Sequence, residues 1–171
     1  MKSTAHRWAL GFCAAALALP ATCSADLVWP ALVLETGLTT WWIIAVGLLV
    51  EFVAILWVWK LPPGKAALIT LCANLLSTLL GMILIPLAGV AWEVFPGLVF
   101  YFVFGIGTFN PITWTATFIL AVLINTFLEG AAIHYLFKQP FGKRYALWLG
   151  AANAVSVAVA FANIMLNPPK F

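Results

Sequence analysis

Two glutamates stand inside long apolar runs of this sequence, where a charged side chain is unusual: Glu51 and Glu129. A carboxylate that faces lipid near the bilayer centre costs at least ~2.5 kcal/mol on insertion scales, so both side chains are expected to face other helices. A carboxyl group in such a place can exchange a proton or bind a cation. The pair is therefore the candidate chemical centre of the chain.

Two asparagines share the depth of the glutamates if the apolar runs are helices. Each of the four lies nine residues from a basic residue at the end of its run, which is ~13 Å at 1.5 Å per residue. The pairs are Glu51 with Lys60, Glu129 with Lys138, Asn74 with Lys65, and Asn153 with Arg144. The four polar side chains are therefore predicted to form one layer near mid-membrane.

Further polar side chains extend this layer. Ser77 and Ser156 follow the asparagines by three residues, on the same helical face and one turn outward. Asn125 precedes Glu129 by one turn, and Asn163 extends the polar face of the last run. A purely structural role stays open, because such groups also form interhelical hydrogen bonds, each worth ~0.6 kcal/mol in membranes.

The composition decides the class of protein that must position these groups. Of 171 residues, 65% are hydrophobic and only 8% are charged, whereas soluble domains carry about 25% charged residues. The net charge of +3 comes from basic residues that stand singly or in pairs, so a nucleic-acid partner is not expected. The chain is predicted to be an all-α integral membrane protein with the lipid bilayer as its surroundings.

Four apolar runs are long enough to cross a hydrocarbon core of ~30 Å as helices. They cover residues 41–59, 66–87, 112–137 and 145–166. The turns at 60–65 and 138–144 hold five of the eight basic residues and no acidic one. By the positive-inside rule both turns are predicted to be cytoplasmic, with both ends of the mature chain outside, as in a bacterial inner membrane.

The N-terminal segment 1–25 has the pattern of a secretory signal. It begins with Lys2 and Arg7, continues with an apolar run and ends with small residues before Asp26. A signal peptide that is cleaved and a signal anchor that is retained both fit this pattern. In either case residues 26–171 are predicted to be a single membrane domain.

The membrane domain contains an internal duplication, with repeat 1 over about 28–87 and repeat 2 over about 94–166. Similarity between apolar helices would explain matches of Ala and Leu, but polar and turn residues also match in order. The pairs are Glu51/Glu129, Lys60/Lys138, Pro62/Pro140, Gly64/Gly142, Asn74/Asn153 and Ser77/Ser156. Because each unit holds two spans, the repeats are predicted to be parallel, related by a pseudo-twofold axis along the membrane normal.

Two aromatic segments, 27–40 and 94–109, are predicted to lie on the outer side. The second is either an interfacial helix or a re-entrant hairpin whose breaks are Gly105, Gly107 and Asn110-Pro111. The last span also has small residues at four-residue spacing, which are predicted to let a neighbouring backbone approach closely. They are Gly150, Ala154, Ala158 and Ala162.

Two classes of function fit these features. The first is a proton- or ion-linked transporter or channel component that uses Glu51 and Glu129. The second is a non-catalytic accessory or assembly subunit, within a homo-oligomer or a larger membrane complex. An enzyme is not expected, and neither a cofactor nor a metal site is predicted, because His134 is the only histidine after the signal segment.

Overall fold

The computed structural model describes residues 33–34, 38, 40–107 and 110–167, and their regular elements are all helical. The predicted signal segment and most of the outer segment 27–40 lie outside the described residues. Four helices are long and apolar enough to cross a membrane. In chain order the elements are α3 (Trp41–Trp59), α4 (Pro63–Trp92), η1 (Glu93–Gly97), α5 (Leu98–Phe104), α6 (Pro111–Tyr135) and α7 (Lys143–Leu166). The predicted helical class and four apolar spans are thus confirmed.

Local sequence signals fix the ends of these helices. Pro63 and Pro111 occupy the first turns of α4 and α6, where a missing N–H costs nothing. Asn110 caps α6, since its side-chain oxygen accepts hydrogen bonds from the backbone N–H of Ile112 (2.8 Å) and Thr113 (3.0 Å).

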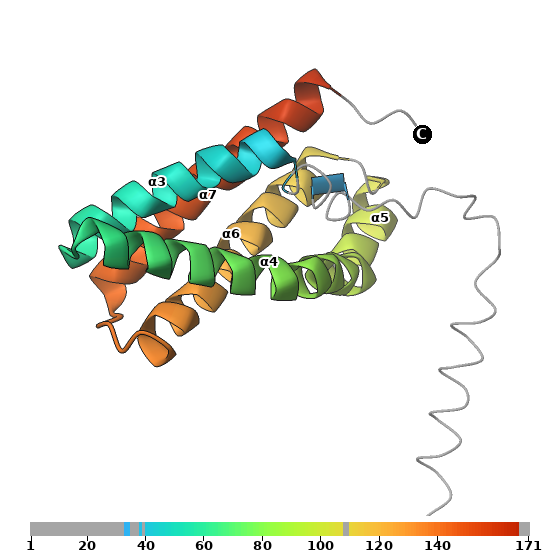
Figure 1. Ribbon diagram of the computed structural model, residues 1–171. Helices are drawn as coiled ribbons and strands as arrows, with labels where there is room; N and C mark the ends of the chain where they lie inside the picture. Colours follow the sequence, from blue (N-terminus) through green and yellow to red (C-terminus); the bar gives the residue numbers. More distant parts are fainter. Residues whose placement is uncertain (1–32, 35–37, 39, 108–109, 168–171) are drawn as a thin grey trace, which may run out of the picture.

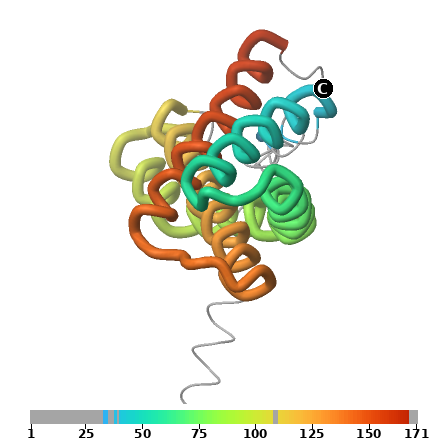
Figure 2. Tube along the Cα trace, turned by 60° about the vertical axis from the view of Figure 1, so that its left-hand side comes forward, coloured from blue at the N-terminus to red at the C-terminus, as the bar shows by residue number. Residues whose placement is uncertain are grey.

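The four long helices form a closed ring of neighbours. Helix α3 packs against α4 and α7, and α6 packs against the same two helices. Figure 1 shows both tight turns at one end of the bundle, at the left and lower left, with α5 and the end of α7 at the other. Helices α3 and α7 run side by side in that view and in the rotated view of Figure 2.

The second long helix does not end near residue 87, as the apolar run predicted, but continues into the segment 94–109; the outer position of that segment stays a prediction. The chain stays helical from Pro63 to Phe104 through the five-residue π-helical segment η1. A proline inside a regular α-helix removes a hydrogen bond and clashes with the preceding turn. Pro96 lies in the wider π-helical segment instead of in a regular α-helical turn. The helix ends at Gly105 (φ 63°), one of the predicted breaks, and Figure 1 shows α5 rising from the end of α4.

Two apolar clusters fill the bundle, one towards each end. The cluster near the turns contains Ile55, Trp59, Ala66, Ile69, Ala73, Ala132, Ile133 and Leu149. The cluster near the opposite end contains Val33, Leu34, Ile43, Ile85, Ala121, Val157, Ala160 and Ile164. On every one of the four helices the residues of the predicted layer (Glu51, Asn74, Ser77, Glu129, Asn153 and Ser156) fall between these two clusters in sequence. The polar groups therefore lie between apolar layers.

The expected small-residue stripe on α7 does not form its buried face. Ala158 and Ala162 are exposed, while Asn153, Ser156 and Ala160 are buried. Burial of Asn153 and Ser156 satisfies their hydrogen-bonding groups inside the bundle, and that requirement turns the stripe away from the neighbouring helices. Gly150, the first residue of the stripe, does lie near a neighbour: an added Cβ would stand 3.5 Å from the hydroxyl oxygen of Thr126.

Candidate functional site

The buried carboxyl of Glu129, on α6, is held by two helices. Its Oε2 accepts a hydrogen bond of 2.7 Å from the Nδ2 of Asn153 on α7. Its Oε1 accepts one of 3.0 Å from the hydroxyl of Ser77 on α4. Asn153 also donates to the Leu149 carbonyl one turn earlier, at 3.2 Å. Glu129 and Asn153 are 2% and 1% exposed, so both side chains are buried within the bundle.

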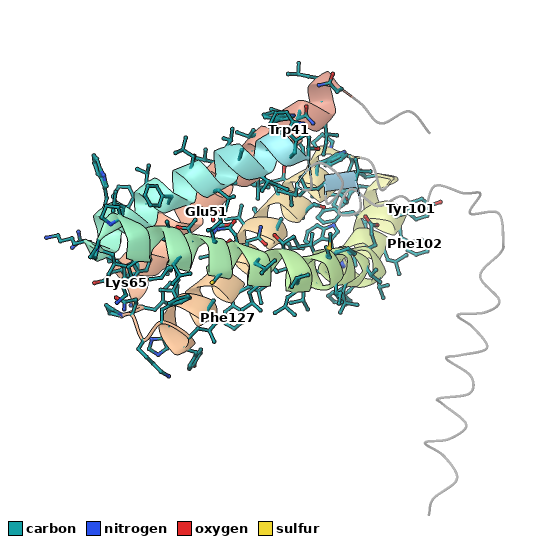
Figure 3. The ribbon with its side chains drawn as sticks, viewed as in Figure 1. Trp41, Glu51, Lys65, Tyr101, Phe102 and Phe127 are labelled. Carbon is teal, nitrogen blue, oxygen red and sulfur yellow. The ribbon has the colours of Figure 1, made fainter. Side chains whose placement is uncertain are left out.

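The carboxyl of Glu51, on α3, is held in the same manner by the same two helices, α4 and α7. Its Oε2 accepts a short hydrogen bond from the Nδ2 of Asn74 on α4. Its Oε1 is 3.4 Å from the hydroxyl of Ser156 on α7. Asn74 also donates to the Thr70 carbonyl at 3.0 Å. Figure 3 shows Glu51 between α3 and α4, on the side of α3 that faces the bundle.

The six predicted residues thus form one connected set, which we call the polar layer: Glu51, Asn74, Ser77, Glu129, Asn153 and Ser156. Each glutamate accepts from an asparagine of its own hairpin and from a serine of the other hairpin. The two serine contacts are the links that cross between the hairpins. Because each glutamate is bonded to residues of both hairpins, the six residues must lie at similar depths in the bundle.

A cavity of about 330 Å³ adjoins the polar layer and is lined by both carboxyls. The side chains of α6 and α7 contribute only polar groups to it, namely Asn125, Glu129, Asn153 and Ser156. Helices α3 and α4 supply the rest of the walls, apart from Leu38. Among these wall residues, Ile44, Leu71 and Leu75 are exposed on the outside of the bundle. The cavity therefore has its floor on α6 and α7 and its mouth between α3 and α4.

The charge balance of this cavity is one-sided. Glu51 and Glu129 are the only ionisable side chains among its lining residues, all of which belong to the part of the chain that the structure describes. Their partners are amide and hydroxyl donors, which carry no net charge. Two carboxyls that share a cavity without a basic side chain can take up a proton or a cation. The arrangement provides acid–base and cation-binding groups.

The two secondary candidates lie in different places. Asn125 lines the cavity, one turn from Glu129. Asn163 is away from it and accepts a hydrogen bond of 3.1 Å from Asn167 near the end of α7. His134 lies at the turn end, where its Nδ1 is 3.1 Å from the Gln139 carbonyl. Neither Asn163 nor His134 joins the polar layer.

Two glycines that the sequence reasoning missed shape the site. An added Cβ on Gly47 would stand 3.2 Å from the Ser156 hydroxyl, so the glycine makes room for the serine that reaches Glu51. Gly81 also lines the cavity, with an added Cβ at 3.6 Å from the Asn125 side-chain oxygen. Each glycine lies four residues from a member of the polar layer, Gly47 before Glu51 and Gly81 after Ser77. That spacing places them on the same helical faces and could have revealed them.

Comparison with known proteins identifies no relative of this chain. No family model matches the chain, and no curated protein and no solved structure matches it either.

Proposed function

We propose that this protein is a proton- or ion-linked membrane transporter or channel component in which Glu51 and Glu129 carry the titrating or cation-binding groups. The observation that carries the proposal is the cavity lined by both carboxyls and by no basic side chain of the described residues. Ionisable groups at such depth in a membrane are costly, and they commonly mark ion or proton pathways. Glutamine could make similar hydrogen bonds at lower desolvation cost, yet a glutamate occupies both positions.

Reconstitution into liposomes tests this proposal. A membrane potential is imposed, and a pH-sensitive dye in the lumen reports proton flux; a parallel series imposes a sodium gradient. The wild-type protein is expected to carry flux in one series. The Glu51→Gln/Glu129→Gln variant is expected to fold but to lose that flux, because the amides keep the shape of the side chains without their ionisation. Glu93→Gln is the control, since it makes the same exchange at a glutamate that does not line the cavity. Wild-type flux in the double Gln variant would refute the proposal.

The duplicated architecture is part of the proposal. Its support is the matching pattern of hydrogen bonds on Glu51 and Glu129. A second parallel is backbone conformation, since Lys60 and Lys138 both have φ 53°, a left-handed conformation that is uncommon outside glycine. In a transporter built from two repeats, a site shared between them can be opened by moving one repeat against the other.

We further propose that the turns at 60–65 and 138–144 are cytoplasmic, in a bacterial inner membrane. The support is the basic composition of both turns and their position at one end of the bundle (Figure 1). In a chain without its native cysteines, single cysteines at Gly64 and Gly142 should resist an impermeant thiol reagent added outside intact cells. A cysteine at Lys170 should react. Labelling of either turn under these conditions would contradict the proposed orientation.

A second candidate function is a non-catalytic accessory or assembly subunit, and α5 is the observation that favours it. This helix has no buried residue, and Tyr101 and Phe102 point outward in Figure 3. An aromatic helix of this kind could dock a larger membrane partner or a second copy of the chain. Purification in mild detergent tests it: a defined partner that is lost when Tyr101 and Phe102 are changed to alanine would support it. Purification of the chain alone would count against it.

A further inference from the structure

The walls of the cavity differ from its floor in a way that bears on what it binds. Apart from the polar groups around the two carboxyls, the lining is mostly aliphatic, with Ile43, Leu48, Leu75 and Ile85 among the contributors. Ligand pockets in proteins are commonly apolar with a few polar groups that fix orientation, at volumes of about 300–1,000 Å³. The cavity, at about 330 Å³, falls at the lower end of that range.

The size of the cavity argues against a bare metal ion as its main occupant. At ~30 Å³ for each water in the liquid, the space would hold on the order of ten waters. A dehydrated ion needs a compact shell of oxygen ligands, whereas most of this wall offers methyl and methylene groups. The free space and its lining suit an organic group better.

The position of the mouth indicates the route by which such a ligand arrives. Leu71 and Leu75 border the mouth and are 57% and 62% exposed. They belong to the outer apolar surface of a helix that is long enough to cross a membrane. An opening at this level faces acyl chains, so a ligand that uses it must dissolve in them.

From this geometry we infer that the cavity between α3 and α4 binds a small lipophilic organic cation, an aryl or alkyl ammonium compound, with its apolar part against the aliphatic walls and its charged head at Glu51 and Glu129. The argument rests on the proposed function, because it makes the same two carboxyls the binding groups. Charge complementarity sets the class of ligand: two carboxyls line the cavity without any basic residue of the described chain. The aliphatic walls and the mouth towards lipid set its lipophilicity.

The test measures binding of radiolabelled benzyltrimethylammonium to the purified full-length protein in mild detergent, by equilibrium dialysis. This probe is permanently charged and has a neutral isostere, neopentylbenzene, in which carbon replaces the nitrogen. We expect saturable binding of the labelled probe. Neopentylbenzene should displace the probe at least about tenfold less well than unlabelled benzyltrimethylammonium does, which corresponds to about 1.4 kcal/mol of recognition of the charge. In the Glu51→Gln/Glu129→Gln variant this tenfold preference should disappear.

A matched pair of variants on α4 tests the location. Gly81→Leu places a branched side chain into the cavity and should abolish binding. Gly64→Leu makes the same exchange where an added Cβ meets nothing within 4 Å, and it should leave binding unchanged. If Gly81→Leu fails to fold, Gly81→Ala replaces it, because its Cβ makes only ordinary contacts, and a weaker loss of affinity is then expected. Equal binding by both members of the pair would overturn the location.

The outcomes separate this inference from the proposed function. Absence of saturable binding of the ammonium probe would overturn the inference, whereas ion flux that depends on the glutamates would still support the transporter. Equal affinity for the charged probe and its neutral isostere would likewise overturn it. Charge-selective binding without any flux in liposomes would support the binding site and count against transport.

Discussion

The two hairpins of this protein use the same polar groups but bury their asparagines to different extents. In the α6–α7 hairpin, Asn153 is 1% exposed. In the α3–α4 hairpin, Asn74 is half-buried. Glu51 and Glu129 are buried alike, at 3% and 2% exposed. The difference therefore lies in the amide partner, with Asn153 on the closed side and Asn74 on the open side.

The helices that carry the two glutamates show the origin of this difference. Helix α3 buries a single row of residues at four-residue spacing: Ile43, Gly47, Glu51, Ile55 and Trp59. Helix α6 buries a wider face, which includes the consecutive residues Leu128, Glu129 and Gly130. A helix with one buried row makes fewer packing contacts that must be broken if it moves. The comparison therefore indicates that, of the two helices that carry the glutamates, α3 is the adaptable one and α6 the fixed one.

The first prediction tests this comparison by overpacking the fixed helix, α6. An added Cβ on Gly130 would stand 2.2 Å from the Cζ of Phe141 and under 3 Å from two further ring atoms. Gly130→Ala is therefore expected to lower the free energy of unfolding by the ~1–3 kcal/mol typical of overpacking. Thermal unfolding in detergent measures the effect. Gly142→Ala is the control, because it meets nothing within 4 Å; equal melting temperatures would show that the ring moves aside freely.

The second prediction compares the two asparagines directly. Asn153→Ala leaves the Glu129 carboxyl without its fully buried amide donor, and buried groups that lose a partner cost ~1–3 kcal/mol. Asn74→Ala removes the corresponding donor of Glu51 at a half-buried position, where less buried surface is lost with the side chain. Asn153→Ala is therefore expected to destabilise the protein more than Asn74→Ala, as measured by unfolding in mixed detergent. The reverse order would contradict the assignment of the closed and open sides.

Much of this arrangement could be predicted from the sequence, because the depth of a residue in a membrane helix follows from the number of residues between it and the end of the helix. The spacing from Lys60 and Lys138 placed both glutamates at one level, and the structure brings the polar layer together there. The side of each helix that faces its neighbours was harder to predict. Lipid and helix interior are equally apolar, so a leucine carries no signal for either; this is why the cavity mouth at Leu75 and the orientation of Ala158 were missed. The continuation of α4 through Pro96 was missed because a π-helical turn relaxes the usual rule for proline.

The smallest expected effect concerns the two serines that cross between the hairpins. Ser77 donates to Glu129 at 3.0 Å, whereas the Ser156 hydroxyl is 3.4 Å from Glu51, at the outer limit of a hydrogen bond. Ser77→Ala should therefore cost the ~0.6 kcal/mol that is typical of interhelical hydrogen bonds in membranes, and Ser156→Ala less. Both serines can also donate to a backbone carbonyl of their own helix, so these variants alone do not isolate the crossing contacts.

Double-mutant cycles isolate them. The cycle of Ser77→Ala with Glu129→Ala, and that of Ser156→Ala with Glu51→Ala, each yield the coupling energy of one contact from unfolding measurements, because alanine cannot accept the hydrogen bond of the serine. We expect measurable coupling between Ser77 and Glu129 and nearly none between Ser156 and Glu51, because the second contact is the longer one. A coupling energy at Ser156–Glu51 that equals or exceeds that at Ser77–Glu129 would mean that the open side closes in solution. The two hairpins would then be equivalent, and α3 would lose its assignment as the adaptable helix.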